Sequence, residues 1–170
     1  MIRNLFFVCL LTAVGVAGPA ADFYPEEKAA ASLQKALKTK QVEITGRFDF
    51  TEQVRDQRKT VVYRFTCDSN PDALFAVFTE SKGRYDMFDY LILTNENGKV
   101  ELVRVLKYRS EHGGEVASRK WLSQFEAYSG GRLIYGEDIS AISGATRSAM
   151  SITRDIPEII QLLQNELLKK

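Results

Sequence analysis

Asn97-Gly98 stands between two runs rich in apolar and β-branched residues, and this pair constrains the fold more than any other feature of the chain. Both residues tolerate a positive φ, which the tight turn of a β-hairpin requires. The flanking runs, Met87 to Thr94 and Lys99 to Tyr108, have the composition of strands. We therefore expect an antiparallel hairpin over residues 87–108.

Three further strands are expected earlier in the chain. Residues 42–50 alternate apolar and polar side chains, which is typical of a half-buried strand, and residues 60–67 are rich in β-branched and aromatic residues. The nearly continuous apolar run of 73–79 indicates a strand buried on both faces. The polar stretches 51–59 and 68–72 separate these strands and are expected to be loops.

Helices are expected on either side of the strands. Residues 25–37 carry one apolar stripe, residues 118–128 form a short aromatic helix, and a last helix runs from about residue 147 to 168. Pro157 is expected to break or kink that helix, with Asp155 as a cap for its second half. This pattern predicts an α+β fold, an antiparallel sheet with flanking helices.

The composition is that of an ordinary globular protein, and the 170-residue length favours one domain over residues 22–170. Residues 1–21 have the features of a secretory signal peptide: Arg3 precedes an apolar run, Leu5 to Val16, and small residues follow at Gly18 to Ala21. The alternative is a retained membrane anchor. The first interpretation predicts an exported, periplasmic protein.

Charge and cysteine content exclude several classes of partner. Arg3 is the one charged residue among the first 21, so removing them leaves 22 Lys and Arg against 22 Asp and Glu. A neutral chain without a basic stripe argues against nucleic acid as a partner. Cys67 is the one cysteine of the mature chain, so it has no partner for an intramolecular disulfide, zinc or an iron–sulfur cluster. We expect a buried inert thiol, with a reactive thiol as the alternative.

Near the end of the chain, Ser143-Gly144-Ala145-Thr146 places a hydroxyl beside the expected start of the last helix. Helix N-termini carry partial positive charge and free N–H donors, so such a turn is suited to binding an anion. The alternative is a helix start in which Ser143 or Thr146 is simply the N-cap.

The tetrapeptide resembles the attachment motif of the FMN-binding domain family, in which FMN is joined through its phosphate to the last hydroxyl residue, here Thr146. Ser148 matches a second hydroxyl of the family pattern. The acidic residue of that pattern falls on Ser140, and Asp138 lies two residues earlier. The resemblance therefore leaves covalent and non-covalent binding of FMN open.

The order of elements agrees with the same family over about residues 75–168, because residues 108–116, with Glu111-His112-Gly113-Gly114, resemble the segment that the family carries after its hairpin. The resemblance gives Arg147 a role at the phosphate and His112 and Trp121 a place against the flavin ring; a solvated arginine, a loop histidine and a core tryptophan are the alternatives. No metal ligands and no catalytic residues are expected. The expected cofactor-binding residues are Thr146, Ser143, Gly144, Ala145, Arg147, Ser148, Glu111, His112, Gly113, Gly114 and Trp121.

The resemblance implies an exported flavoprotein that carries FMN and transfers electrons, and is a carrier rather than a stand-alone enzyme. A flavin transferase would install the cofactor. Membrane or periplasmic redox proteins would exchange electrons with it, placing it in the periplasm and peripheral to the membrane. An exported binding or scaffolding domain without flavin is the alternative function.

Overall fold

Residues 23–168 are described by the structure, a computed structural model. The expected signal peptide, residues 1–21, lies outside the described residues. Within residues 23–168, none of the helices combines the length and the apolar character needed to span a bilayer.

Five antiparallel strands form the sheet, and each pairs with the strand before it in the chain, in the order β1-β2-β3-β4-β5. The strands are β1 (Val42–Asp49), β2 (Thr60–Cys67), β3 (Asn70–Lys82), β4 (Met87–Thr94) and β5 (Val100–Lys107). Helices accompany this sheet, so the expected α+β class with an antiparallel sheet and flanking helices is confirmed.

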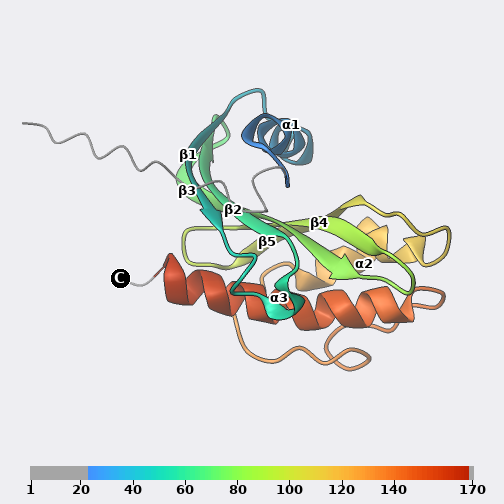
Figure 1. Cartoon of the computed structure of the whole chain (residues 1–170). Coiled ribbons are helices and arrows are strands. Elements are labelled where there is room, and N and C mark those ends of the chain that lie inside the picture. The colour runs from blue at the N-terminus through green and yellow to red at the C-terminus, as the bar shows by residue number, and fades with distance from the viewer. Residues whose placement is uncertain (1–22, 169–170) are drawn as a thin grey trace, which may run out of the picture.

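Helices cover both faces of the sheet (Figure 1): α1 (Glu26–Leu37) lies over one face and α3 (Thr146–Glu166) lies against the other. In β3, Leu74 and Phe78 belong to the core on the α1 side, whereas the intervening Val77 belongs to the core on the α3 side. Because neighbouring strand residues point to opposite faces, both faces of this strand are buried, as the apolar run of 73–79 predicted.

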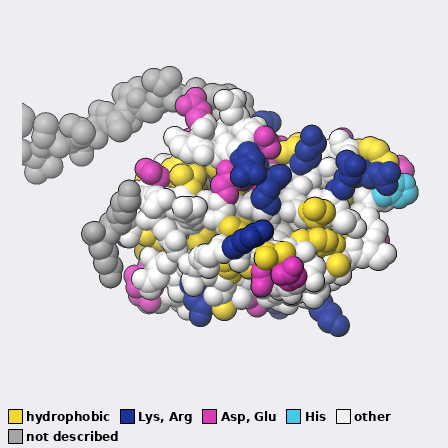
Figure 2. Space-filling view, turned by 90° about the horizontal axis from the view of Figure 1, so that it is seen from below, with side chains coloured by type: hydrophobic (Ala, Val, Ile, Leu, Met, Phe, Trp, Pro, Cys, Tyr) yellow, Lys and Arg dark blue, Asp and Glu magenta, His cyan; other side chains and the backbone are white. Residues whose placement is uncertain are grey.

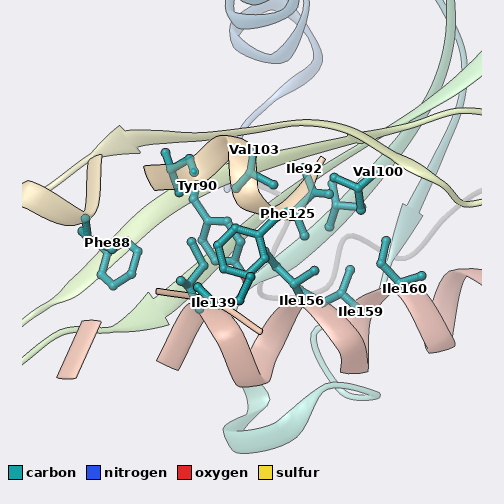
Figure 3. Close-up of a cluster of buried hydrophobic side chains, with 14 of the residues drawn as sticks. Phe88, Tyr90, Ile92, Val100, Val103, Phe125, Ile139, Ile156, Ile159 and Ile160 are labelled. Atoms are coloured by element: carbon teal, nitrogen blue, oxygen red, sulfur yellow. The ribbon is translucent and has the colours of Figure 1, made fainter. Parts of the chain in front are cut away.

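The larger core fills the space between the sheet and α3 (Figure 3). Side chains from β4 and β5 meet the apolar stripe of the helix there, and Phe125 and Ile139 complete the cluster. Its labelled members are Phe88, Tyr90, Ile92, Val100, Val103, Phe125, Ile139, Ile156, Ile159 and Ile160.

The smaller core lies under α1. Ala29 and Leu33 of the helix are fully buried against aromatic and aliphatic residues of the three central strands. Cys67 belongs to this cluster and is buried, which confirms the expected buried thiol. The sheet residues of this core are Val61, Tyr63, Phe65, Cys67, Leu74, Ala76, Phe78, Leu91 and Leu93.

Both predicted turns around the central strands need adjustment. The β4–β5 hairpin forms as expected, but Gly98 alone of the pair has a positive φ, 76°, and the loop is held by Asn95, whose side chain accepts hydrogen bonds from the N–H groups of Asn97 and Lys99. The loop expected at 68–72 is shorter than predicted, because Cys67 pairs with Asn70 across a turn centred on residues 68–69 and β3 begins at Asn70.

The helix expected over 118–128 is also wrong as a single element. The structure has η2 (Gly114–Ala117), α2 (Arg119–Leu122) and η3 (Ser123–Phe125) in succession, and Ala127 follows with φ of 69°. Within 118–128 two short helical segments, α2 and η3, replace the one helix, because the N–H of Ala127 and the carbonyl of Tyr128 bond to Val100 at the start of β5. The chain leaves the helix to make those two bonds.

Helix α3 is continuous through Pro157, so of the expected break or kink the break does not occur. Proline lacks the N–H for one helical hydrogen bond, but the buried stripe of α3 holds the helix to the sheet on both sides of it. Asp155 does not act as a cap. It is 1% exposed, and its carboxylate accepts hydrogen bonds from Ser81 at 2.6 Å and from Arg154 at 3.0 Å.

An ion-pair cluster ties the middle of α3 to the loop between β1 and β2. Arg58 Nη1 lies 3.7 Å from Asp155 and its Nη2 donates to Glu158 at 2.8 Å, while the N–H of Arg55 donates to the other oxygen of Glu158. Partial burial alone raises the pKa of Glu158, but the bonds from Arg58 and Arg55 outweigh it and leave that pKa below its ordinary value.

Candidate functional site

Thr146 is the first residue of α3, and the turn before it sets its position. Gly144 has a φ of 82°, a conformation that glycine adopts without steric cost, and Ala145 occupies the N-cap position. None of the described side chains caps this helix. The alternative in which Ser143 or Thr146 is the capping residue is therefore wrong, and N–H groups of the first turn are left without a side-chain acceptor.

The two hydroxyls of the motif have different surroundings. Thr146 is exposed, whereas Ser148 is 2% exposed and lies 2.9 Å from the hydroxyl of Tyr108. Tyr108 itself donates to the carbonyl of His112 at 3.1 Å, so the proton between the two hydroxyls comes from Ser148. Ser148 is thus neither an exposed side chain nor a free donor for a phosphate. It fastens α3 to the segment after β5.

A cavity of about 390 Å³ lies at the start of α3. It brings together the motif and the segment after β5, two stretches that are separate in the sequence and that the resemblance assigned to one site. The residues that line it are Arg84, Tyr108, His112, Gly113, Gly144, Ala145, Thr146, Arg147 and Ser148.

The residues that line this cavity favour an anion by their charge, and the nearby carboxylate of Glu115 acts in the opposite sense. Arg84 and Arg147 contribute guanidinium groups, and none of the lining residues carries a carboxylate. Figure 2, a view from the α3 side, shows the histidine near one end of this face, close to basic side chains. Two permanent cations and the free N–H groups of a helix start form an environment that stabilises a negative charge.

Glycines allow the two walls of the cavity to come close. Gly113 has a φ of 88°, and a Cβ there would lie 2.6 Å from the Tyr108 hydroxyl. A Cβ on Gly144 would lie 3.3–3.4 Å from the carboxylate of Glu115, which places that acid beside the motif turn. Larger residues at these positions would force the two segments apart.

Glu111, Gly114 and Ser143 are exposed and do not line the cavity, although the sequence grouped them with it. Gly114 begins η2, and a Cβ added there would meet no atom within 4 Å beyond its chain neighbours, so nothing nearby requires a glycine. Seven of the expected binding residues line the cavity. Glu111, Gly114 and Ser143 do not, although each is next to a lining residue in the sequence.

Trp121 also lies outside the cavity, because its ring packs edge-on against Phe125 in the larger core. Its indole N–H donates to the carbonyl of Ser140 at 2.8 Å, and the N–H of Ser140 donates to Gln124 at 2.8 Å. The hydroxyl of Tyr135 accepts a third bond from the N–H of Ile142. The core-packing alternative for Trp121 is therefore confirmed, and its polar edge positions the loop before the motif.

The acidic position of the family motif is occupied by the exposed side chain of Ser140. Asp138 does not take its place, because the Asp138 carboxylate accepts a hydrogen bond from the N–H of Ile134 at 2.8 Å. That bond closes the turn in which Tyr135 bridges to Ile139. Asp138 thus stabilises its own turn.

Two lining residues, Tyr108 and Arg84, were not among the expected binding residues, and no sequence pattern indicated Arg84. It lies in the β3–β4 turn, where the N–H of Gly83 donates to the carbonyl of Asp86. A Cβ on Gly83 would lie 3.3 Å from Ser148 Oγ, so this turn packs directly on the first turn of α3. The sequence signal was a glycine followed by an arginine between two strands, which by itself does not indicate a site.

Comparison with models of known protein families gives no match, and no curated protein matches the chain.

Proposed function

We propose that this protein binds FMN at the start of α3, with the phosphate at Thr146, and that it carries electrons as a flavoprotein with an FMN-binding-domain-like fold. The observation that supports this most is the shared cavity, in which the exposed Thr146 hydroxyl lies among Arg84, Arg147, His112 and Gly113. The segment at 108–116 and the motif at 143–146 resemble parts of one family, and residues of both line this cavity although they are far apart in the sequence.

The residues present fit a flavin mononucleotide. A cavity of about 390 Å³ is within the range of small-molecule sites. Arg84 and Arg147 match the charge of a phosphate, and the uncapped first turn of α3 supplies N–H donors. Gly113 and Gly144 let the two walls of the cavity approach each other, because the Tyr108 hydroxyl and the Glu115 carboxylate lie where larger side chains would be.

Thr146 is the proposed attachment residue. Its Oγ1 would form a phosphoester with the flavin phosphate as the hydroxyl loses its proton, and a flavin transferase would supply a flavin dinucleotide donor whose phosphoanhydride bond breaks, with a nucleoside monophosphate as the leaving group. The exposed position of Thr146 suits access by such an enzyme. Arg147 and Arg84 then offset the charge of the phosphodiester, while Tyr108 and Ser148 hold the two walls together.

The flavin would supply the electron-transfer chemistry, and the protein would set its exposure and its potential. The further steps of the proposal come from the family resemblance: export to the periplasm, maturation by a transferase, and exchange of electrons with membrane or periplasmic redox proteins. A covalent bond would prevent loss of the cofactor outside the cytoplasm.

The test is the intact mass of the protein produced together with a flavin transferase, read with the fluorescence of the denatured band. We expect one added FMN in the parent and in Thr146→Ser, and none in Thr146→Ala, because alanine has no nucleophilic oxygen. Ser148→Ala is the matched control: it removes the buried neighbouring hydroxyl and should keep the added mass.

Two results would contradict the proposal in different ways. Added mass that persists in Thr146→Ala would move the attachment to another residue. A parent that gains no mass and also fails to bind free FMN would leave the flavin-free binding domain as the function.

A further inference from the structure

A groove of about 630 Å³ runs along the later part of α3 and shares no lining residue with the cavity at Thr146. Its floor is a partly exposed stripe of the helix. One wall is the loop that carries η1 (Arg55–Gln57), and the other is the loop after η3. The lining residues are Arg55, Tyr128, Gly130, Gly131, Arg132, Arg154, Pro157, Glu158, Gln161 and Gln164.

Hydrogen bonds hold both walls of the groove to the helix. The N–H of Arg55 donates to Glu158 at 2.6 Å on one side. On the other side, the side-chain amide of Gln164 donates to the carbonyl of Ser129 at 2.8 Å. Successive helical residues are turned by about 100°, so Glu158 and Gln164 lie about 120° apart around the axis with Gln161 between them. The groove therefore has a defined width and a helical floor.

The groove carries an excess of positive charge. One arginine comes from each wall and one from the floor: Arg55, Arg132 and Arg154. Among residues 23–168, no ion pair engages the guanidinium of Arg55 or Arg132. Glu158 is the one carboxylate of the lining, and both its oxygens already accept hydrogen bonds, from the N–H of Arg55 and from Arg58. The guanidinium groups of the two walls are therefore available to an anion.

The shape of the groove suits an extended chain better than a compact ion. From Arg154 to Gln164 the helix rises roughly 15 Å, the length of about four or five extended residues. Gly130 and Gly131 have a positive φ, and a Cβ on Gly131 would meet no atom within 4 Å beyond its chain neighbours, so a peptide backbone can approach this wall. The exposed amide of Gln161 offers a donor and an acceptor to that backbone.

We propose that this groove binds an acidic segment of a partner protein, laid along α3 in an extended conformation, with Asp or Glu side chains of the segment on Arg55, Arg132 and Arg154. This inference does not depend on flavin binding. Guanidinium groups match carboxylates in charge and in fork geometry. The basic character is confined to the groove, since residues 22–170 are formally neutral, and a protein without a basic excess is a poor ligand for nucleic acid.

The test titrates the purified protein into a fluorescently labelled hexaglutamate peptide and follows the anisotropy of the label. We expect binding that weakens as NaCl rises from roughly 20 to roughly 300 mM, because salt screens exposed charges. Arg55→Gln and Arg132→Gln should each weaken it roughly two- to fivefold, the range for one exposed charge pair. Gln161→Glu should weaken binding and Gln161→Lys should strengthen it, because they add charges of opposite sign to the floor. All three positions are exposed, so these variants should fold as the parent does.

Lys35→Gln, on α1 at the opposite face of the sheet, removes one positive charge away from the groove and should leave the affinity unchanged (Figure 1). An equal loss in this variant would show that the peptide follows net charge alone, and the groove would be wrong. The absence of hexaglutamate binding at low salt would also overturn the proposal. Citrate or a six-nucleotide single-stranded DNA that binds more tightly than the peptide, with the same dependence on Arg55 and Arg132, would replace the acidic segment with a small anion or with nucleic acid.

Discussion

Ser140 presents its side chain to solvent while its backbone is held from both sides, by Trp121 at the carbonyl and by Gln124 at the N–H. A residue held in this way tolerates a change of side chain without a change of loop. An acid at this position would therefore act outside the fold, on a partner that approaches the loop.

Ser140→Asp tests that idea. We expect a larger fraction of flavin-loaded protein at a limiting amount of transferase, because the carboxylate restores the recognised pattern. The free energy of unfolding should stay within ~0.5 kcal/mol of the parent, as is usual for an exposed substitution. Intact mass and chemical denaturation measure the two quantities. A destabilised variant with unchanged loading would mean that the position acts within the loop.

Trp121→Phe separates the packing of the indole from its hydrogen bond. Phenylalanine keeps an aromatic ring against Phe125 but loses the N–H that holds Ser140. We expect a loss of ~1 kcal/mol in the free energy of unfolding, the net value of one hydrogen bond. We also expect slower flavin loading because the loop is less ordered. Equal loading rates in the two proteins would show that the clamp does not affect the motif.

At the level of elements, α3 carries the candidate motif in its first turn and is fastened in its middle to the β1–β2 loop through Arg58, Asp155 and Glu158. The pKa of Glu158 lies below its ordinary value of 4.5. A carboxylate with a lowered native pKa stabilises the fold above its unfolded pKa, and this contribution is lost as the pH falls through the native pKa.

Glu158→Gln should therefore lower the free energy of unfolding by ~1–2 kcal/mol near neutral pH, because it weakens a charged hydrogen-bond pair with Arg58. The difference from the parent should shrink as the pH falls below about 4.5. Denaturation curves over a pH series measure it. Glu166→Gln, an exposed change at the end of the same helix, provides the baseline, and an equal effect there would rule out the ion pair as the cause.

The sequence predicted the elements that local pattern determines. β2 and β4 match their expected bounds of 60–67 and 87–94, because alternation and β-branched residues reflect the pleat directly. The errors arose where tertiary contacts decide. The chain after Phe125 leaves the helix to bond with Val100, and α3 passes through Pro157 because the core holds both halves.

The site shows the same division. The motif and the segment after β5 were identifiable because each has a local signature. Arg84 was not, because it reaches the cavity only when the β3–β4 turn packs on α3 through Gly83 and Ser148. For Trp121 the sequence left ring contact and core packing open, because its burial in the core is a property of the folded chain.

The molecule as a whole is a sheet with a core on each face. The candidate site lies on the α3 side, at the start of that helix. Leu33 of α1 is fully buried in the core opposite α3. Leu33→Ala should lower the free energy of unfolding by ~2–5 kcal/mol, the cost of lost burial and a cavity.

The affinity of the folded Leu33→Ala protein for FMN should not change. The altered core lies on the opposite face of the sheet from α3, which begins at Thr146 (Figure 1). Denaturation and FMN titration measure the two properties, with Lys35→Ala as the exposed control on the same helix. A fall in affinity equal to that of a site variant would show that the two faces are coupled.

The strand order leaves β1 paired on one side only, so its outer backbone groups form the open border of the sheet. An incoming strand from another molecule would meet a bulge between Ile44 and Gly46 and the charged side chains of Glu43, Arg47 and Asp49. Irregular, charged borders of this kind are poor templates for cross-chain pairing. The border thus disfavours aggregation in a chain whose described residues, 23–168, contain no disulfide.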